Sequence, residues 1–174
     1  MSITFKLTQR LFKLIREDLQ RSHPFAEERV GFITCRFAVP SSGDLLVLAH
    51  EYYPVADKDY VDDSRYGALL GSNAFRNAMQ LAYTHNVGIF HIHPHMHYGL
   101  PKPSPIDKRE TAAFVPDFFH VRPQLPHGAL IISINSLSGQ LWHPISQRPQ
   151  PITLFKLVGA PLVTLRGTHD ARTI

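Results

Sequence analysis

The sequence lacks the features that define several common protein classes. Its 174 residues include a single cysteine, Cys35, so no disulfide framework can form within the chain and a reducing compartment is expected. No apolar run approaches the ~18 residues of a membrane span. The first residues carry no long apolar core of the kind found in secretory signals. These absences predict a cytoplasmic protein with no membrane partner.

Concentrated positive charge is also lacking. The formal net charge is +4 and the isoelectric point is about 9.4, yet the Lys and Arg residues are scattered and form no basic run. No nucleic-acid partner is therefore predicted. The apolar content of 44% is typical of a globular protein. The length predicts one domain spanning residues 1–174, with a frayed tail from about Gly167.

Histidine, in contrast, is abundant, and two histidines stand at the end of a predicted strand. Residues 87–90 are apolar strand formers, and His91 and His93 come directly after them. On an extended chain residues i and i+2 face the same way, so both imidazoles can reach one point. In a chain with 11 histidines such a pair also arises by chance or on a surface strand. The weight of the pair therefore depends on the residues downstream of it.

A loop rich in Gly and Pro leads from these histidines to a predicted helix start. Ser104 and Pro105 are the residue types of a helix N-cap and a first helical position. Asp107 then lies in the first turn of that helix, where it can face back towards the strand end. Two His and one Asp with an open fourth position are typical of a catalytic zinc site. His91, His93 and Asp107 are therefore predicted to bind one Zn²⁺ per chain.

The order of strand, H-x-H-P, Gly/Pro loop, S-x-x-D and helix resembles the signature of the JAMM (MPN+) zinc metalloproteases. That family carries a glutamate well upstream of the histidines. Its prokaryotic JAB branch opens with P-x-x-x-E-x-x-G, and Pro24, Glu28 and Gly31 have this spacing here. Glu27 is one place off the spacing and Glu51 lies in a later segment, so both are weaker candidates than Glu28.

The resemblance implies a role for each of these residues and a fold around them. Glu28 is the expected general base, and Ser104 is the expected hydrogen-bond donor to the oxyanion of the tetrahedral intermediate. The implied fold is α/β, a three-layer α/β/α sandwich with a mixed curved sheet of the cytidine-deaminase-like kind (an MPN/JAB domain).

Three features depart from the family pattern. The residue between the two histidines is Ile92, where relatives often have Ser or Thr. The loop from His93 to Asp107 has 13 intervening residues, more than is usual. Two further histidines, His95 and His97, continue the alternation. They could be rival ligands, but we expect them at the surface or at the edge of the cleft.

The implied activity is a zinc-dependent isopeptidase or peptidase that cleaves after the C-terminus of a ubiquitin-like protein. The expected partners are that protein or its conjugates, together with E1- or E2-like proteins of the same system. The sequence leaves open deconjugation, processing of a sulfur-carrier protein and antiviral conjugation. Two irregular segments, residues 52–71 and 115–127, are either ordinary loops or substrate-facing insertions. If they face the substrate, Tyr60 and Phe118 are candidate anchor residues.

Two other functional classes stay open. One is a metal-free MPN module that acts as a scaffold, against which the complete set of catalytic residue types argues. The other is an H-x-H amidohydrolase. That fold is a barrel of ~250 residues, and a chain of 174 residues is too short to form it.

Hydrophobic spacing predicts the remaining elements. Period-two alternation indicates strands, and apolar residues at i, i+3, i+4 and i+7 indicate helices. A turn is predicted at Ser138-Gly139. The predicted strands comprise residues 3–7, 32–39, 45–50, 87–90, 128–135, 140–144, 152–158 and 162–165. The predicted helices comprise residues 9–21 with Thr8 as the cap, a segment capped by Ser72 or Asn73, and a segment that begins at Pro105.

Overall fold

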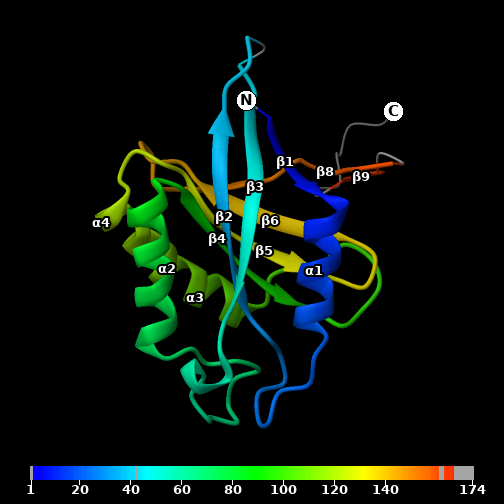
Figure 1. Cartoon of the computed structure of the whole chain (residues 1–174), viewed down its shortest axis with the longest axis vertical. Coiled ribbons are helices and arrows are strands. Elements are labelled where there is room, and N and C mark those ends of the chain that lie inside the picture. Colours follow the sequence, from blue (N-terminus) through cyan, green and yellow to red (C-terminus); the bar gives the residue numbers. More distant parts are fainter. Residues whose placement is uncertain (1, 42, 161–162, 167–174) are drawn as a thin grey trace.

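A computed structural model describes residues 2–41, 43–160 and 163–166. Its centre is a nine-stranded sheet with the strand order β7-β6-β5-β4-β2-β3-β1-β8-β9 (Figure 1). The predicted frayed tail lies outside the described residues. The strands are β1 (Ile3–Thr8), β2 (Gly31–Ala38), β3 (Leu45–Pro54), β4 (Gly88–Pro94), β5 (His127–Ile132), β6 (Leu137–Trp142), β7 (Pro149–Pro151), β8 (Leu154–Val158) and β9 (Val163–Arg166).

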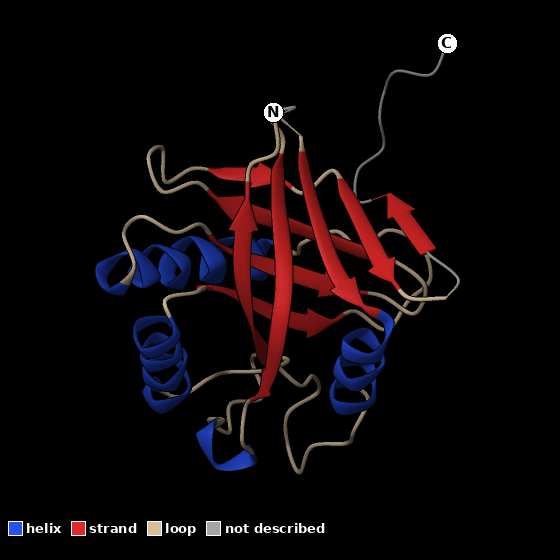
Figure 2. Cartoon of the chain, turned by 45° about the horizontal axis from the view of Figure 1, so that its top comes forward, coloured by secondary structure: helices blue, strands red, loops and turns tan. Residues whose placement is uncertain are grey.

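The sheet is mixed and curved, as predicted. β4 pairs with β5 in parallel, and β1 pairs in parallel with both β3 and β8, whereas the other neighbouring strands are antiparallel. Figure 2 shows the strand direction turning progressively across the sheet. This is the right-handed twist accumulated over many strands. The α/β class with a mixed curved sheet is thus confirmed.

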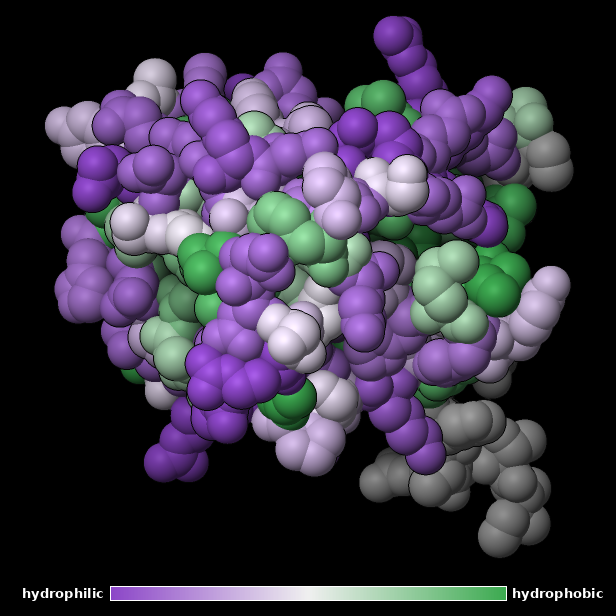
Figure 3. Space-filling view, turned by 90° about the horizontal axis from the view of Figure 1, so that it is seen from below, coloured by the Kyte–Doolittle hydropathy of each residue, from purple (hydrophilic) through white to green (hydrophobic). Residues whose placement is uncertain are grey.

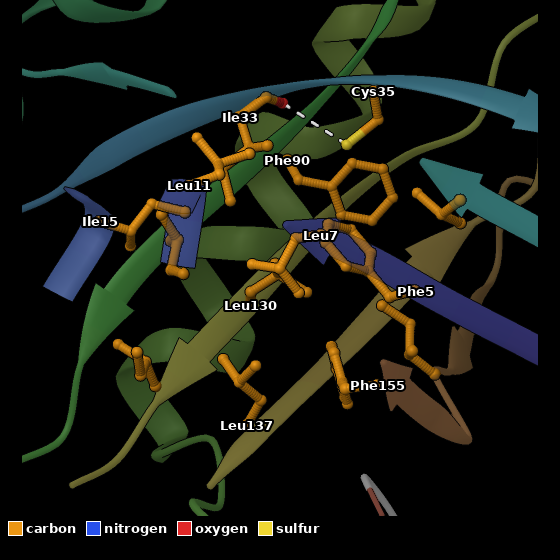
Figure 4. Close-up of a cluster of buried hydrophobic side chains, with 14 of the residues drawn as sticks. Phe5, Leu7, Leu11, Ile15, Ile33, Cys35, Phe90, Leu130, Leu137 and Phe155 are labelled. Atoms are coloured by element: carbon orange, nitrogen blue, oxygen red, sulfur yellow. Dashed lines mark hydrogen bonds between the residues drawn. The ribbon is translucent and has the colours of Figure 1, made fainter. Parts of the chain in front are cut away.

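One face of the sheet is covered by α1 (Gln9–Leu19). The hydroxyl of Thr8 caps this helix by accepting a hydrogen bond from the Leu11 backbone N–H at 3.1 Å, as the sequence predicts. The buried side of α1 packs on a cluster that includes Phe5 and Phe90, in edge contact at 5.3 Å between ring centroids (Figure 4). Cys35 is buried in the same cluster, which fits a structural thiol.

The opposite face is covered by α2 (Ser72–His85). Three alanines at positions 74, 78 and 82 let this helix approach the sheet closely. The helix begins after Gly71, which makes no side-chain cap, so the predicted capping by Ser72 or Asn73 is wrong. At its other end Asn86 adopts φ +53°, the left-handed conformation that ends many helices. The other helices are α3 (Pro105–Phe114) and α4 (Phe118–Val121), with short 3₁₀ turns η1 (Asp57–Asp59) and η2 (Val115–Asp117).

The hairpin between β5 and β6 turns earlier than predicted. Ser133 closes it by donating its backbone N–H to the Ser136 carbonyl at 2.9 Å. Ser138 and Gly139 therefore lie inside β6 rather than in a turn. A Cβ atom on Gly139 would lie 2.4 Å from the Leu130 side chain, so this glycine serves close packing within the sheet.

No helix within the described part of the chain is both long and apolar enough to cross a membrane.

Candidate metal centre

Strand β4, which carries His91 and His93, lies in the middle of the sheet, and each of its seven residues is buried. Phe90 and Ile92 face the α1 core, so alternation directs His91 and His93 to the other face. The chain stays extended beyond the strand, because the His95 N–H donates to the Ile132 carbonyl of β5 at 2.8 Å. His95 therefore continues on the same face as His91 and His93.

A reciprocal cap places the carboxylate opposite these histidines. The Ser104 hydroxyl accepts a hydrogen bond from the Asp107 N–H at 3.1 Å, and the Ser104 N–H donates to Oδ2 of Asp107 at 2.7 Å. Pro105 occupies the first helical position of α3. The predicted helix start is confirmed. Asp107 is fixed in the first turn by both its backbone and its side chain.

Three potential ligands meet at this point. Nε2 of His93 lies 3.3 Å from Oδ1 of Asp107, and Nε2 of His95 lies 3.3 Å from Oδ2 of the same carboxylate. One ligand atom from each of these three residues lies within 4.8 Å of the other two. His91 does not belong to this group, although its ring centroid is 5.3 Å from that of His93. The structure thus brings His93, His95 and Asp107 together, while His91, which the sequence predicts as a ligand, lies next to His93 outside this group.

The electrostatics of the group suit a cation. Both ring nitrogens of His93 are buried without a hydrogen bond, and so is Nδ1 of His91. Burial holds the pKa of His91 and of His95 below the usual value, and the neighbouring His93 adds to the effect, so both imidazoles are neutral at pH 7. Neutral imidazole is the form that binds metals.

The carboxylate at the centre of the group is ionised. Burial acts to raise the pKa of Asp107, but the neighbouring His93 and the hydrogen bonds with Ser104 outweigh it and hold the pKa well below its usual range. A permanent anion therefore faces the buried ring of His93, whose nitrogens make no hydrogen bond although Nε2 lies 3.3 Å from the carboxylate. A divalent cation would complete this arrangement, so the donor set fits a metal.

Glu28 approaches the same place from the segment before β2. The Glu27 and Glu28 backbone N–H groups both donate to the Gly67 carbonyl, at 2.8 and 3.1 Å. Gly67 in turn lies beside the Glu28 carboxyl group. Burial is the main cause that raises the pKa of Glu28; the charges of Asp107 and Glu27 add to the effect, while His93 opposes it. A carboxylate with a raised pKa is a better proton acceptor, as a general base requires.

A recess of about 300 Å³ joins these groups, and we call it the glutamate recess. Glu27, residues 66–70 and part of α3 line this recess. All five residues predicted for the site line it as well, namely Glu28, His91, His93, Ser104 and Asp107. Figure 3 looks onto the end of the molecule that carries the loops at the bottom of Figure 1, where hydrophilic side chains surround smaller apolar areas. The fold therefore brings the predicted glutamate, serine and aspartate to one place from three separate segments of the chain.

The rival glutamate and the outer histidine lie elsewhere. Glu51 is exposed on β3, where its carboxylate accepts a hydrogen bond from Tyr53, and it does not line the recess. His97 is exposed, with its ring 6.0 Å from that of His95 between centroids, which is the predicted cleft-edge position. The same position is predicted for His95, but its side chain is only 18% exposed and contacts Asp107. The unbroken alternation of His91, His93 and His95 is the sequence signal that indicates its place.

The two irregular segments contribute unequally. Residues 66–70 line the glutamate recess. Tyr60, in contrast, is 7% exposed, and its hydroxyl donates a hydrogen bond to the Val30 carbonyl. Phe118 is fully buried in the cluster under α2. Neither aromatic side chain is available to a partner, so their predicted role as substrate anchors is wrong. Both are core residues: Tyr60 directly follows η1, and Phe118 is the first residue of α4.

Comparison with known proteins adds little to this geometry. No protein-family model matches the chain, and no curated protein sequence does. Among solved structures, the chain is similar to the N-terminal domain of STIL from Trichoplax adhaerens, with 8% identity and a TM-score of 0.40 over 80% of this chain and 41% of that one. A likeness this distant carries no functional argument.

Proposed function

We propose that this chain is a metal-dependent peptidase or isopeptidase of the JAMM type, with Zn²⁺ as the expected ion. His93, His95 and Asp107 would hold the ion, one per chain. The observation that carries the proposal is the meeting of the ionised Asp107 carboxylate with the buried ring of His93, whose nitrogens make no hydrogen bond, in one recess with Glu28. The MPN-type α/β/α sandwich that the sequence resemblance implies is part of the same proposal.

The protein groups around the ligands have separate tasks. When bound, the ion supplies Lewis-acid chemistry and lowers the pKa of water towards ~7. Glu28 accepts a proton from the attacking water and returns it to the leaving amine. The Ser104 hydroxyl oxygen is engaged as a helix cap, which leaves its proton free to donate to the developing oxyanion.

His91 has a supporting position in this scheme. It is buried beneath His93, and its ring also contacts Phe114 at 4.9 Å between centroids. Kept neutral by burial, it fills the floor of the recess and restricts the orientation of the His93 ring. We therefore assign His91 to positioning and His95 to the metal.

The expected substrate is a ubiquitin-like protein or its conjugate, with its C-terminal tail extended along residues 66–70 in the glutamate recess. Those residues form one wall of the recess and part of α3 forms another, so an extended tail would lie between them. The 100–103 segment lies beside the ligands and favours a slim, diglycine-like end at the cleaved bond, whereas Pro94 faces α1. A cytoplasmic setting with E1- or E2-like partners belongs to the same proposal.

The test is a cleavage assay on linear fusions of candidate ubiquitin-like proteins, with and without a chelator, combined with elemental analysis. We expect about one zinc per chain and chelator-sensitive cleavage at the tail. Glu28→Gln protein should retain the zinc and lose cleavage. Purified protein that binds no divalent metal would contradict the proposal and favour a metal-free scaffold.

A further inference from the structure

A second recess, of about 410 Å³, lies on the other side of the candidate ligands. It shares His93 and Asp107 with the glutamate recess, so the two spaces meet at the candidate metal centre. Its floor is formed by β5 and β6, and the 100–103 segment of the long loop forms its wall. Its volume lies in the range of small-ligand sites. We call it the loop recess.

The walls of the loop recess are predominantly apolar. They come from the loop and from the side chains of β5 that alternate to this face. Lys102 is exposed where it lines this space, and the other charged or titratable lining groups are the candidate ligands themselves. An apolar group would be favoured here, and a carboxylate placed deep in the recess would be disfavoured. The apolar lining residues are Leu100, Pro101, Pro103, Ala129, Ile131 and Pro151.

One polar group within these walls has no partner. Ser138 is 8% exposed, and its hydroxyl makes no hydrogen bond with the protein. It lies opposite Ile131 in the β5–β6 ladder and alternates to the same face as Gln140, which also lines the recess. Buried hydroxyl groups are nearly always hydrogen-bonded. Ser138 therefore offers an unpaired hydroxyl group to a ligand that enters the recess.

We propose that the loop recess binds an apolar side chain of the residue that follows the cleaved bond, with the Ser138 hydroxyl hydrogen-bonded to the backbone of that residue. This inference rests on the proposed function. The glutamate recess is assigned to the tail on the acyl side of the bond, so the loop recess receives the leaving-group side. The long loop between His93 and Asp107 supplies its wall and would set this specificity. The natural substrate is then a linear fusion that continues with an apolar residue.

The first experiment measures cleavage of linear fusions whose diglycine end is followed by Leu, Gly or Asp. We expect kcat/KM for Leu to exceed that for Gly by about 10-fold or more, with Asp the poorest. Ser138→Leu, which fills the recess, should reduce the preference for Leu to within about twofold. Ser138→Ala, which keeps the space, should retain the preference at a lower rate. Equal kcat/KM for the three fusions in the wild type would overturn the inference and leave the proposed function standing.

The second experiment does not need activity. Metal-free, isotope-labelled protein is titrated with N-acetyl-L-leucine methylamide, and N-acetylglycine methylamide serves as the control. We expect saturable shifts of the Ala129, Ile131 and Ser138 amide signals with the leucine probe alone, and we expect Leu100→Ala to weaken them if Ser138→Leu fails to fold. Binding without any cleavage would refute the proposed function but support the recess. A leucine probe that leaves these signals unchanged would overturn the inference.

Discussion

Nε2 of His95 lies 3.3 Å from Oδ2 of Asp107, the oxygen that also accepts the Ser104 backbone N–H. One carboxylate is thus held by the first turn of a helix and turned towards His93 of β4 and His95 just beyond that strand. Because helix α3 begins at this point, the geometry of the candidate centre depends on a local capping interaction. This relationship makes the helix cap and the metal centre a single structural unit.

The cap can be tested through Ser104. Ser104→Ala removes the hydroxyl that accepts the Asp107 N–H, so we expect a loss of about 1 kcal/mol in the free energy of unfolding. Asp107 would also be less well positioned, and zinc affinity should fall. Ser104→Thr keeps the hydroxyl and is the matched control. Chemical denaturation and zinc titration measure both effects. Unchanged stability and zinc affinity in Ser104→Ala would contradict the assigned cap.

The general base can be separated from the metal ligands. Glu28→Gln keeps the size of the side chain but cannot accept a proton, so we expect cleavage to slow by roughly 10²–10⁴-fold while zinc content is unchanged. Glu51→Gln is the control, because Glu51 lies on β3 outside the recess. Single-turnover kinetics on the same fusion protein would compare them. A near wild-type rate for Glu28→Gln with an inactive Glu51→Gln would show that the upstream motif has been misassigned.

His127 gives the fold a pH dependence. Its Nδ1 accepts the Ile89 N–H at 3.1 Å, and its Nε2 lies 3.2 Å from the Arg122 carbonyl, so the neutral ring fits and the protonated ring does not. Burial lowers the pKa of His127 to about 4 in the folded state. In the unfolded chain this histidine has an ordinary pKa of about 6.5, so the unfolded chain binds a proton at pH values where the folded chain does not. The contribution of His127 to the free energy of unfolding is complete above about pH 6.5. It declines as the pH falls towards 4, by up to about 3 kcal/mol.

The measurement is the slope of unfolding free energy against pH between 6.5 and 4.5, in the presence of a chelator. His127→Gln should flatten this slope relative to the wild type. His120→Gln alters an exposed histidine on the neighbouring helix and should leave the slope unchanged. Parallel slopes for wild type and His127→Gln would show that the buried ring does not behave as described.

Local signals in the sequence are sufficient to predict the elements around the site. Ser104, Pro105 and Asp107 predict the start of α3, because capping depends on residues within one turn. The apolar strand formers at residues 87–90 likewise predict β4, and the i, i+2 spacing of His91 and His93 predicts their shared face. The α/β class is what the family resemblance implies.

The errors arise from packing between distant segments. The sequence predicts a surface or cleft-edge position for His95, because the alternation of the histidines is its one local signal and the pairing with β5 that keeps the chain extended beyond Pro94 involves a distant segment. Tyr60 and Phe118 stand in irregular segments that could face a partner, although the sheet and α2 bury them. Glycine is typical of turns, so the sequence predicts a turn at Gly139. In the structure Gly139 lies within β6, because the Leu130 side chain lies too close to leave room for a Cβ atom.

The central claim is that His95, rather than His91, completes a metal site with His93 and Asp107. It is tested most directly by zinc titration of three single variants, His95→Ala, His91→Ala and the control His97→Ala. We expect zinc affinity to fall more than about 100-fold for His95→Ala, to fall less for His91→Ala, and to match the wild type for His97→Ala. Wild-type zinc affinity in His95→Ala, or a wild-type protein that binds no zinc, would contradict the account.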